Sequence, residues 1–425
     1  MRPVLKLSLV MLLGAVALGL GSCKKSSSTA TSAAGGNTIA GAASNVVTIS
    51  VSAGPNPQSV INTLYTTVTV CAPGSTTNCQ TISNIQVDTG ASGLRLFSSV
   101  LQPSVAAALP LMVDGSGNNI VECAEYADGY AWGPVATADL TVSGESAPSL
   151  PIQIIGSAQF PTVPVACFGK GKSLDSVAAF GANGTIGIAT LRQDCGSSCD
   201  FSLDPAINPG FYYACTPGGT CNVTTVPLGG PGTSGPQQVQ NPVTYFTTDN
   251  DGVIIELPSV AATGASTATG ALVFGIDTQT NNATNLGLPV ITLAAGTGLV
   301  STTLNQISYP DGFFDTGSNG LYFQYSGLAA CTGSIAEFYC PTATTGFTAT
   351  VASSTNTLIN IAFSVANAQS LENAGGSELA FSNLAGTTAS ASTFDWGLPF
   401  FYGRNVYLAI EGKSTSAGVG PYASF

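Results

Sequence analysis

Between residues 46 and 87 the chain alternates small apolar side chains with hydroxyl-bearing ones, with a period of two. Residues 47–51 and 65–70 follow this alternation, and residues 82–87 form an apolar run-in to Asp88. Successive side chains of a strand point to opposite faces of a sheet, so this period predicts β-strands rather than helices. Clusters of Pro, Gly, Ser and Asn separate the runs and predict turns.

Further strand-like runs follow downstream, and they extend the same interpretation to the rest of the chain. Residues 121–126, then a short turn, then 135–142 read as a strand, a hairpin tip and a returning strand. The other predicted strands are residues 243–246, 270–277, 289–294, 303–309 and 406–410. Only 8% of the residues are charged and 50 are glycine. The sequence therefore predicts an all-β fold with many turns.

One short phrase occurs twice along the chain. It reads D-T-G-A-S-G-L from Asp88 and D-T-G-S-N-G-L from Asp315. Each copy follows an apolar residue, which predicts a buried strand that ends in a tight glycine turn. A single copy would be ordinary turn chemistry. Two copies, 315 − 88 = 227 residues apart, favour two similar lobes that each contribute one carboxylate.

When two carboxyl groups meet at a pseudo-two-fold axis, ionising both costs free energy because the two negative charges repel each other. They share one proton, so the pair holds an acid and a base at once and can activate a water while it protonates a carbonyl. The glycines let the loops approach each other, and the threonines can tie them together by hydrogen bonds. The residues expected to support the two aspartates are Thr89, Gly90, Thr316, Gly317 and Ser318.

With these motifs, the sequence resembles a two-lobed, pepsin-like aspartic peptidase. It also resembles an uncharacterised family of bacterial lipoproteins that carries the same loops. The hairpin at 121–142 is similar to the pepsin-like flap, which places the flap residues at Tyr126 and Gly129. The tip is one residue longer than the usual pattern, Tyr130 is a rival for the flap tyrosine, and Tyr126 could instead be a packed strand aromatic.

Two later stretches resemble the strands that run beside the aspartate loops in that family. Residues 180–189 are similar to D-G-I-L-G-L-A, with Asn183 where the family has Asp. Residues 394–401 are similar to I-L-G-D-x-F, with Asp395 at an apolar position and Leu398 where Asp is expected. The resemblance covers residues 46–425 and implies an N-terminal lobe at 46–284 and a C-terminal lobe at 285–425. Between the two stretches, the Cys-, Pro- and Gly-rich segment 191–242 is interpreted as a disulfide-pinned insertion.

The two aspartate loops differ at the residue after D-T-G. In the family a hydroxyl there donates a hydrogen bond to its aspartate, which Ser318 can do for Asp315 and Ala91 cannot do for Asp88. A hydrogen bond to the charged form lowers a carboxyl pKa. The sequence therefore predicts that Asp315 carries the charge and that Asp88 is harder to ionise.

The composition of the chain excludes several classes of function. The chain has no histidine, which excludes Ser-His-Asp and Cys-His catalysis and any histidine metal site. The formal net charge of −12 argues against nucleic acid or an anionic membrane surface as a partner. We expect no metal and no cofactor, and we expect the protein to be a monomer.

The first 45 residues are predicted to direct export and to act as a tether rather than to form part of the fold. Arg2 and Lys6 precede an apolar run at 7–21, which is typical of a signal peptide over residues 1–22 and too short for a membrane span. The run ends in L-G-S-C, which resembles a bacterial lipoprotein cleavage box. The resemblance implies lipid on Cys23, and the alternative is an ordinary secretory signal. Residues 23–45 are predicted to be a flexible tether.

The 10 cysteines that follow Cys23 are an even number in an exported chain, which predicts disulfides. Cys71/Cys79 and Cys331/Cys340 are near enough in sequence to close small loops. The four in the insertion are expected to pair among themselves, or alternatively to hold zinc, and Cys123/Cys167 follows by elimination. The insertion cysteines are Cys195, Cys199, Cys215 and Cys221.

Three interpretations of function compete. The first is an aspartic endopeptidase, exported and lipid-anchored at the bacterial cell envelope, which hydrolyses peptides or proteins with a water activated by Asp88 and Asp315. The second is a protein of the same fold that binds peptides or another ligand without catalysis. The third is a surface lipoprotein with a structural role. Both D-T-G loops are intact, which favours the peptidase.

Overall fold

The structure is a computed structural model that describes residues 30–31, 38–55, 60–204, 207–216, 219–284, 287–355, 357–373 and 376–425. The predicted signal peptide (1–22) and Cys23 lie outside the described residues, and the predicted tether (23–45) lies only partly within them. Within the described ranges, no helix is long and apolar enough to cross a membrane.

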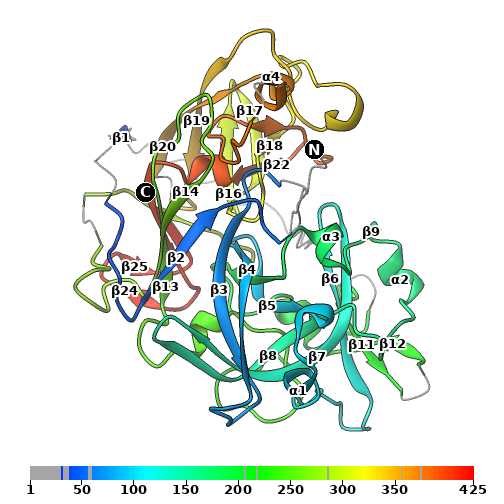
Figure 1. Cartoon of the computed structure of the whole chain (residues 1–425). Helices are drawn as coiled ribbons and strands as arrows, with labels where there is room; N and C mark the ends of the chain where they lie inside the picture. Colours follow the sequence, from blue (N-terminus) through cyan, green and yellow to red (C-terminus); the bar gives the residue numbers. More distant parts are fainter. Residues whose placement is uncertain are drawn as a thin grey trace, which may run out of the picture.

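Sixteen strands form one large sheet whose order alternates between distant parts of the chain: β12-β11-β6-β7-β8-β5-β10-β4-β3-β2-β14-β13-β23-β26-β15, with β9 paired to β7 (Figure 1). The strands are β2 (Val46–Val51), β3 (Leu64–Cys71), β4 (Cys79–Asp88), β5 (Ser92–Phe97), β6 (Asn119–Tyr126), β7 (Gly129–Val142), β8 (Glu145–Ile155), β9 (Lys172–Ser173), β10 (Gly184–Ile188), β11 (Tyr212–Cys215), β12 (Cys221–Val223), β13 (Gly252–Leu257), β14 (Ala268–Phe274), β15 (Val290–Thr292), β23 (Arg404–Ala409) and β26 (Tyr422–Ser424).

A second sheet of eight strands has the order β1-β20-β19-β16-β17-β22-β18-β21. Its strands are β1 (Ala30–Thr31), β16 (Val300–Leu304), β17 (Ile307–Asp315), β18 (Leu321–Phe323), β19 (Thr345–Ala352), β20 (Leu358–Val365), β21 (Ala385–Gly386) and β22 (Thr393–Gly397). A small hairpin joins β24 (Ser414–Thr415) to β25 (Gly418–Val419).

Helices are short in the described part of the chain. The α-helices are α1 (Pro103–Ala106), α2 (Val165–Phe168), α3 (Val177–Phe180) and α4 (Ala368–Asn373), and the 3-10 helices are η1 (Ser98–Val100), η2 (Gly196–Cys199), η3 (Pro242–Tyr245), η4 (Gly333–Ile335) and η5 (Leu398–Phe400). The prediction of an all-β fold is confirmed.

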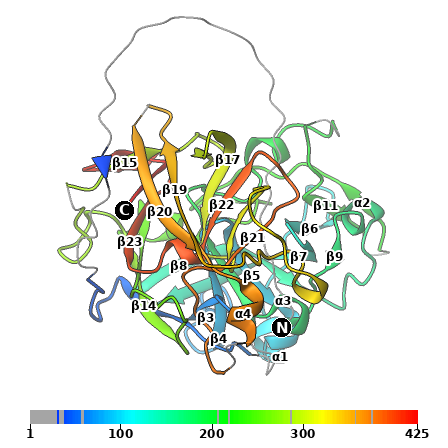
Figure 2. The ribbon, with the colours of Figure 1, turned by 90° about the horizontal axis from the view of Figure 1, so that it is seen from above.

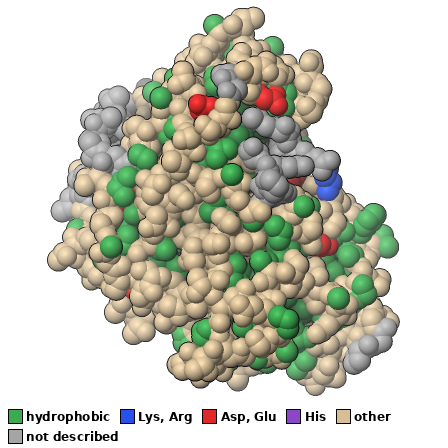
Figure 3. Space-filling view, in the orientation of Figure 1, with side chains coloured by type: hydrophobic (Ala, Val, Ile, Leu, Met, Phe, Trp, Pro, Cys, Tyr) green, Lys and Arg blue, Asp and Glu red, His purple; other side chains and the backbone are tan. Residues whose placement is uncertain are grey.

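The two sheets form two bodies that share one apolar core. In Figure 1 the second sheet lies above most of the first, and in Figure 2, seen from above, its strands β17, β19, β20 and β22 lie near the centre of the view. The main core cluster is continuous from Val87 in the first body to Phe314 and Trp396 in the second. Figure 3 shows few charged side chains on this face, as the 8% charged content requires. Strands β15, β23 and β26 all follow residue 285 in the sequence, yet they belong to the first sheet. The boundary between the two lobes at 284/285 stays a prediction.

Two of the predicted strands are wrong in detail. Residues 243–246 lie mostly in η3, because Pro242 has no N–H for a ladder and the Asn241 side chain accepts from Val243 N at 3.1 Å, which caps a helical turn. Residues 303–309 are not one strand but the hairpin between β16 and β17. Its turn residues Asn305 and Gln306 both have positive φ, which suits a two-residue hairpin turn.

Candidate active site

Each aspartate loop is built by the same three-strand arrangement. Asp88 ends β4, and Asp315 ends β17. Strand β10 runs parallel to β4 with Gly187 opposite Asp88, and it also pairs with β5 after the loop. Strand β22 runs parallel to β17 with Gly397 opposite Asp315, and it pairs with β18 after that loop. The two stretches that the resemblance placed beside the loops do lie there.

The two carboxyl groups face each other in the interior. Asp88 is 2% exposed and Asp315 is 1% exposed. A side-chain carbon added to Gly317 would lie 2.9 Å from Oδ1 of Asp88 and 2.9 Å from Oδ1 of Asp315. These two oxygens are therefore less than about 6 Å apart, which is within the range of direct charge coupling. The two aspartates of the repeated motif are therefore neighbours in the structure.

The glycines of the motif are required because each one faces the opposite aspartate. A side-chain carbon on Gly90 would lie 2.6 Å from Cγ of Asp315, and one on Gly317 would lie 2.7 Å from Cγ of Asp88. Each glycine N–H also donates to its own aspartate: Gly90 N to Asp88 Oδ1 at 2.8 Å and Gly317 N to Asp315 Oδ1 at 2.6 Å. Backbone donors that point at a carboxylate favour its charged form.

The threonines tie the two loops together with four reciprocal hydrogen bonds. Thr89 Oγ1 donates to Phe314 O at 3.0 Å and accepts from Thr316 N at 2.9 Å. Thr316 Oγ1 donates to Val87 O at 2.8 Å and accepts from Thr89 N at 3.1 Å. Gln86 adds a bond across the same interface, from Nε2 to Gly317 O at 2.9 Å. The relative position of the two carboxyls is thus fixed by buried hydrogen bonds.

The groups around Asp315 act on its pKa in opposite directions. Ser318 Oγ does donate to Asp315 Oδ2, at 2.9 Å. Burial nevertheless raises the pKa of Asp315 well above its ordinary value, and the charges of Asp88 and Asp395 raise it further against the hydroxyl and the Gly317 N–H. The prediction that Asp315 carries the charge and that Asp88 is harder to ionise stays a prediction, because the two aspartates titrate as a pair.

The hairpin of β6 and β7 covers the first loop, with Ala127 and Asp128 at its tip. Tyr126 is 5% exposed, lines the same pocket as Gly90, and its ring packs edge-on against Phe180. Burial raises its pKa, and the charge of Arg95 lowers it. Tyr130 instead packs in a separate apolar cluster on the other side of the hairpin. Of the two candidates, Tyr126 is the one that faces the aspartate loop.

Gly129 has a positional role in the hairpin rather than a contact with the aspartates. A side-chain carbon at Gly129 would lie 2.1 Å from Lys172 O, because β9 pairs with β7 at Gly129 and Tyr130. The glycine therefore allows a short neighbouring strand to lie against the base of the tip.

A small pocket of about 30 Å³ opens between the first loop and the hairpin. Its walls are mainly small or apolar, and it lies directly beside the residue that follows the first D-T-G. The lining residues are Gly90, Ala91, Ser92, Arg95, Ala124, Glu125, Tyr126, Ala189, Leu191, Gln193, Asp194 and Phe211.

Sequence reasoning missed a buried ionic cluster behind this pocket. Arg95 Nη2 lies 2.5 Å from Glu122 Oε1 and 2.9 Å from Asp194 Oδ2, and Tyr212 Oη donates to Asp194 Oδ1 at 2.7 Å. Burial and the charge of Glu122 raise the pKa of Asp194 well above its ordinary value. One guanidinium charge faces two acids, so the charges of the cluster balance when one of the two acids is protonated. A signal was present in the sequence, since Arg95 interrupts an otherwise apolar strand.

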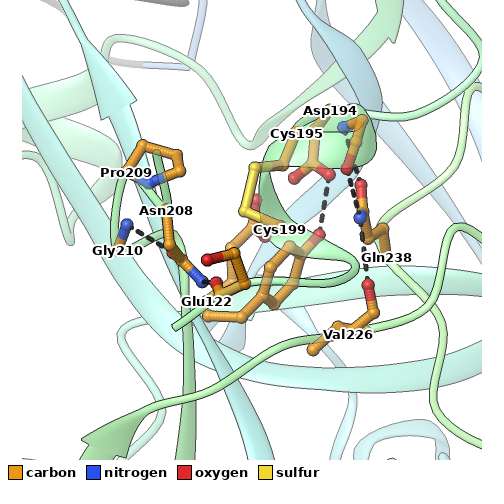
Figure 4. The surroundings of a disulfide bond; sticks show 12 residues. Glu122, Asp194, Cys195, Cys199, Asn208, Pro209, Gly210, Val226 and Gln238 are labelled. Carbon is orange, nitrogen blue, oxygen red and sulfur yellow. Dashed lines mark hydrogen bonds between the residues drawn. A yellow bond between two sulfur atoms is a disulfide. The ribbon is translucent and has the colours of Figure 1, made fainter. Parts of the chain in front are cut away.

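The cysteine-rich insertion carries part of this cluster and extends the hairpin. Its strand β11 pairs with β6, so the insertion adds β11 and β12 to the outer edge of the hairpin sheet. Figure 4 shows the Cys195–Cys199 disulfide next to Asp194, and Glu122 lies nearby. The five disulfides are Cys71–Cys79, Cys123–Cys167, Cys195–Cys199, Cys215–Cys221 and Cys331–Cys340.

These disulfides agree with the expected pairings and with the preference for pairing within the insertion. Cys123–Cys167 links β6 of the hairpin to α2, 44 residues later. Among the described residues no group of three or more His, Cys, Asp or Glu side chains is arranged to hold a metal ion. Multiple disulfides indicate a protein that resides outside the cytoplasm.

Comparison with known proteins gives three findings. Solved structures match the chain, among them the aspartic proteinase from Irpex lacteus, with 15% sequence identity, a TM-score of 0.48, and coverage of 89% of this chain and 96% of that chain. No curated protein matches. The model of a family described as protein of unknown function (DUF3443) matches residues 41–425, and the chain belongs to this family.

Proposed function

We propose that the protein is an aspartic endopeptidase that hydrolyses peptide bonds with a water held between Asp88 and Asp315. The observation that carries the proposal is the pair of buried carboxyl oxygens less than about 6 Å apart, held by four hydrogen bonds between Thr89 and Thr316 and their neighbours. We assign the shared proton to Asp315, and the raised pKa that burial and the charge of Asp88 give to Asp315 supports this assignment. Asp88 is then the base.

The roles follow from this charge distribution. Asp88 accepts a proton from the attacking water, and protonated Asp315 donates a proton to the oxygen of the scissile carbonyl. The amide carbon becomes tetrahedral without a covalent bond to the protein. The proton on Asp88 then passes to the leaving nitrogen as the carbon–nitrogen bond breaks, and Asp315 takes back a proton from one hydroxyl of the tetrahedral carbon, which restores the starting pair. The pocket beside Ala91 receives a substrate side chain, and Tyr126 covers it.

The test is cleavage of a peptide library by the wild type, Asp88→Asn and Asp315→Asn. Each substitution keeps the size of the side chain and removes the carboxylate, so both should lose cleavage by at least about three orders of magnitude. Asp204→Asn, on an exposed position of the insertion, is the matched control and should cleave normally. Cleavage by both dyad variants at the wild-type rate would assign the activity elsewhere. A wild type that binds peptides without cleaving them would favour the binding alternative.

We infer that the enzyme acts at the bacterial cell envelope, as an exported monomer anchored by lipid on Cys23. The disulfides support the compartment, and the L-G-S-C box supports the anchor. Cys23→Ala should move the protein from the membrane fraction to the soluble fraction of cells that export it. An unchanged distribution would remove the anchor, and light scattering of the soluble variant would measure the oligomeric state.

A further inference from the structure

Large apolar side chains are exposed on α2 and on the cysteine-rich insertion. Of the ten that are exposed among the described residues, six lie between positions 165 and 223, namely Val165, Phe168, Phe201, Leu203, Ile207 and Val223. In Figure 3 hydrophobic side chains gather on the right-hand side of the molecule, over the region where Figure 1 places α2. Contiguous exposed apolar patches mark interaction sites, whereas single exposed residues need no explanation.

The two segments that carry most of these side chains lie against each other. Lys170 follows Phe168 by two residues, and its Nζ donates to Pro209 O at 3.5 Å. Pro209 in turn follows Ile207 by two residues. The exposed part of α2 and the exposed loop of the insertion are therefore neighbours in space, although they are far apart in the sequence.

A groove of about 220 Å³ lies beside α2, between the turn of β11 and β12 and the segment that leads into the helix. Its lining includes the amide side chains of Asn119 and Gln159 and the hydroxyl groups of Thr162 and Thr216. Strand β12 is the outermost strand of the large sheet, so within the described residues one of its edges has no neighbouring strand. An extended polypeptide can bind such an edge through its backbone and place a side chain in the groove. We call the groove and the six exposed side chains together the insertion surface.

Disulfides hold the insertion surface in place. Cys123–Cys167 fastens α2 to β6 of the hairpin, and Cys215–Cys221 joins β11 to β12 at the groove. A surface that is already ordered loses less entropy when it binds a partner. This covalent framework therefore suits the binding of another chain.

Two links connect the insertion surface to the pocket beside the dyad. Lys170 Nζ lies 2.8 Å from Glu125 Oε1, and Glu125 lines the pocket together with Gly90 of the first aspartate loop. From the insertion, Phe211 lines the same pocket, two residues after Pro209. The insertion surface is therefore a continuation of the proposed substrate site rather than a separate one.

The charges around the insertion surface favour a polypeptide over a membrane as its partner. Lys170 and Lys172 follow α2, whereas Asp200 and Asp204 lie on the exposed loop of the insertion. The two signs balance, while a protein that docks on anionic lipid presents a cluster of basic residues. The amides and hydroxyls of the groove can pair with peptide groups, and an acyl chain offers them no partner.

We propose that the insertion surface docks an extended segment of a protein substrate, a segment that carries large apolar side chains and flanks the bond to be cleaved. This inference rests on the proposed function, because it names the kind of substrate that the dyad would cleave. The segment buries its apolar side chains against residues such as Phe168 and Phe201, and one of them enters the groove. The substrate class is thus an extended protein chain rather than a short peptide.

The test measures the binding of two fluorescent peptides of equal length by anisotropy. One carries Leu and Phe at intervals among Ser, Gly, Lys and Glu, and the other has Ser at the apolar positions. The protein is the soluble Cys23→Ala chain with Asp88→Asn, which prevents cleavage. Burial of the exposed part of one Phe ring corresponds to a change of about 5- to 30-fold in Kd, so Phe168→Ser and Phe201→Ser should each weaken binding of the apolar peptide by that factor.

The matched control is Val419→Ser, at a position on β25 that is 60% exposed and lies outside the insertion surface. It should leave the affinity for the apolar peptide unchanged. Unchanged affinity in both Phe variants, or equal binding of the two peptides, would overturn the proposal. Flotation with phosphatidylethanolamine–phosphatidylglycerol vesicles that the Phe variants abolish would overturn it in favour of a membrane. A dimer in light scattering that they dissociate would overturn it in favour of a second copy.

Cleavage separates this proposal from the proposed function. In the protein with Asp88 intact, Phe168→Ser and Phe201→Ser should raise KM for the long apolar peptide without changing kcat, and should leave the cleavage of a short peptide unchanged. An equal loss of cleavage on short and long peptides would contradict the docking role. A wild type that cleaves nothing removes the peptidase, while the binding comparison still decides whether the insertion surface docks an apolar segment.

Discussion

Removal of the Thr89 hydroxyl isolates the contribution of the inter-loop hydrogen bonds. Thr89→Val keeps the shape of the side chain but leaves Phe314 O and Thr316 N without their partner, at contacts of 3.0 Å and 2.9 Å in the wild type. Phe314 is 4% exposed and Thr316 is 0% exposed, so water cannot easily replace the hydroxyl. An unsatisfied buried group costs about 1 to 3 kcal/mol. The two together predict a loss of about 2 to 6 kcal/mol in the free energy of unfolding.

The matched control is Thr89→Ser, which keeps the hydroxyl and loses one methyl group. It should cost about 0.5 to 1.5 kcal/mol, the usual effect of deleting one buried methyl. Thr316→Val should lose as much as Thr89→Val, because Thr316 Oγ1 makes the equivalent two bonds to Val87 O and Thr89 N. Urea denaturation followed by tryptophan fluorescence at one fixed pH measures all four proteins. Equal stability of Thr89→Val and Thr89→Ser would show that these bonds do not hold the loops together.

Three further predictions concern pH and the motif itself. Burial, the largest effect, and Asp249 raise the pKa of Glu145 from 4.5 to about 7, so the folded state holds a proton that the unfolded state releases. Stability should therefore fall as pH rises from 4.5 to about 7. Above this range Glu145→Gln should be more stable than the wild type by about 1 to 2 kcal/mol, discounted for solvent screening, and equal urea midpoints at pH 8 would contradict it. Gly90→Ala should abolish peptide cleavage, because its methyl would lie 2.6 Å from Cγ of Asp315, and full activity would refute this placement. Ala91→Ser should supply a donor to the aspartate of its own loop and move the acidic limb of the pH–rate profile to lower pH, whereas unmoved limbs would show that water already fills that role.

The sequence was sufficient for the parts of the site that depend on local chemistry. The two D-T-G phrases predict strand-to-turn transitions on their own, and the pattern around Tyr126 predicts a hairpin. The short cysteine loops, such as Cys71–Cys79, pair over a separation of only eight residues. All of these features are encoded within a few residues of where they act.

What the sequence could not supply depends on neighbours far along the chain. The pKa of Asp315 is raised first by burial and then by Asp88 and Asp395, which lie 227 and 80 positions away in the sequence, so no local pattern could predict it. Arg95 meets Asp194 only because the insertion folds back onto the hairpin through β11. The prediction of a strand at 243–246 was wrong for a different reason, because the Asn241 side chain accepts from Val243 N and caps a helical turn there instead.

The order of strands in the large sheet has a consequence for how the chain folds. Strand β2, from residues 46–51, is separated only by β14 and β13 from β23, which pairs with β26 at residues 422–424. Strand β2 pairs with β14 at Val51 and Ala268, 268 − 51 = 217 residues apart, and β13 pairs with β23 at Leu257 and Arg404, 404 − 257 = 147 residues apart. Such distant pairings form slowly, because loop-closure entropy is lost before the pairing is gained. The large sheet, which includes β4 and therefore Asp88, cannot be complete until β23 and β26 have been synthesised, so the surroundings of Asp88 depend on residues made long after it.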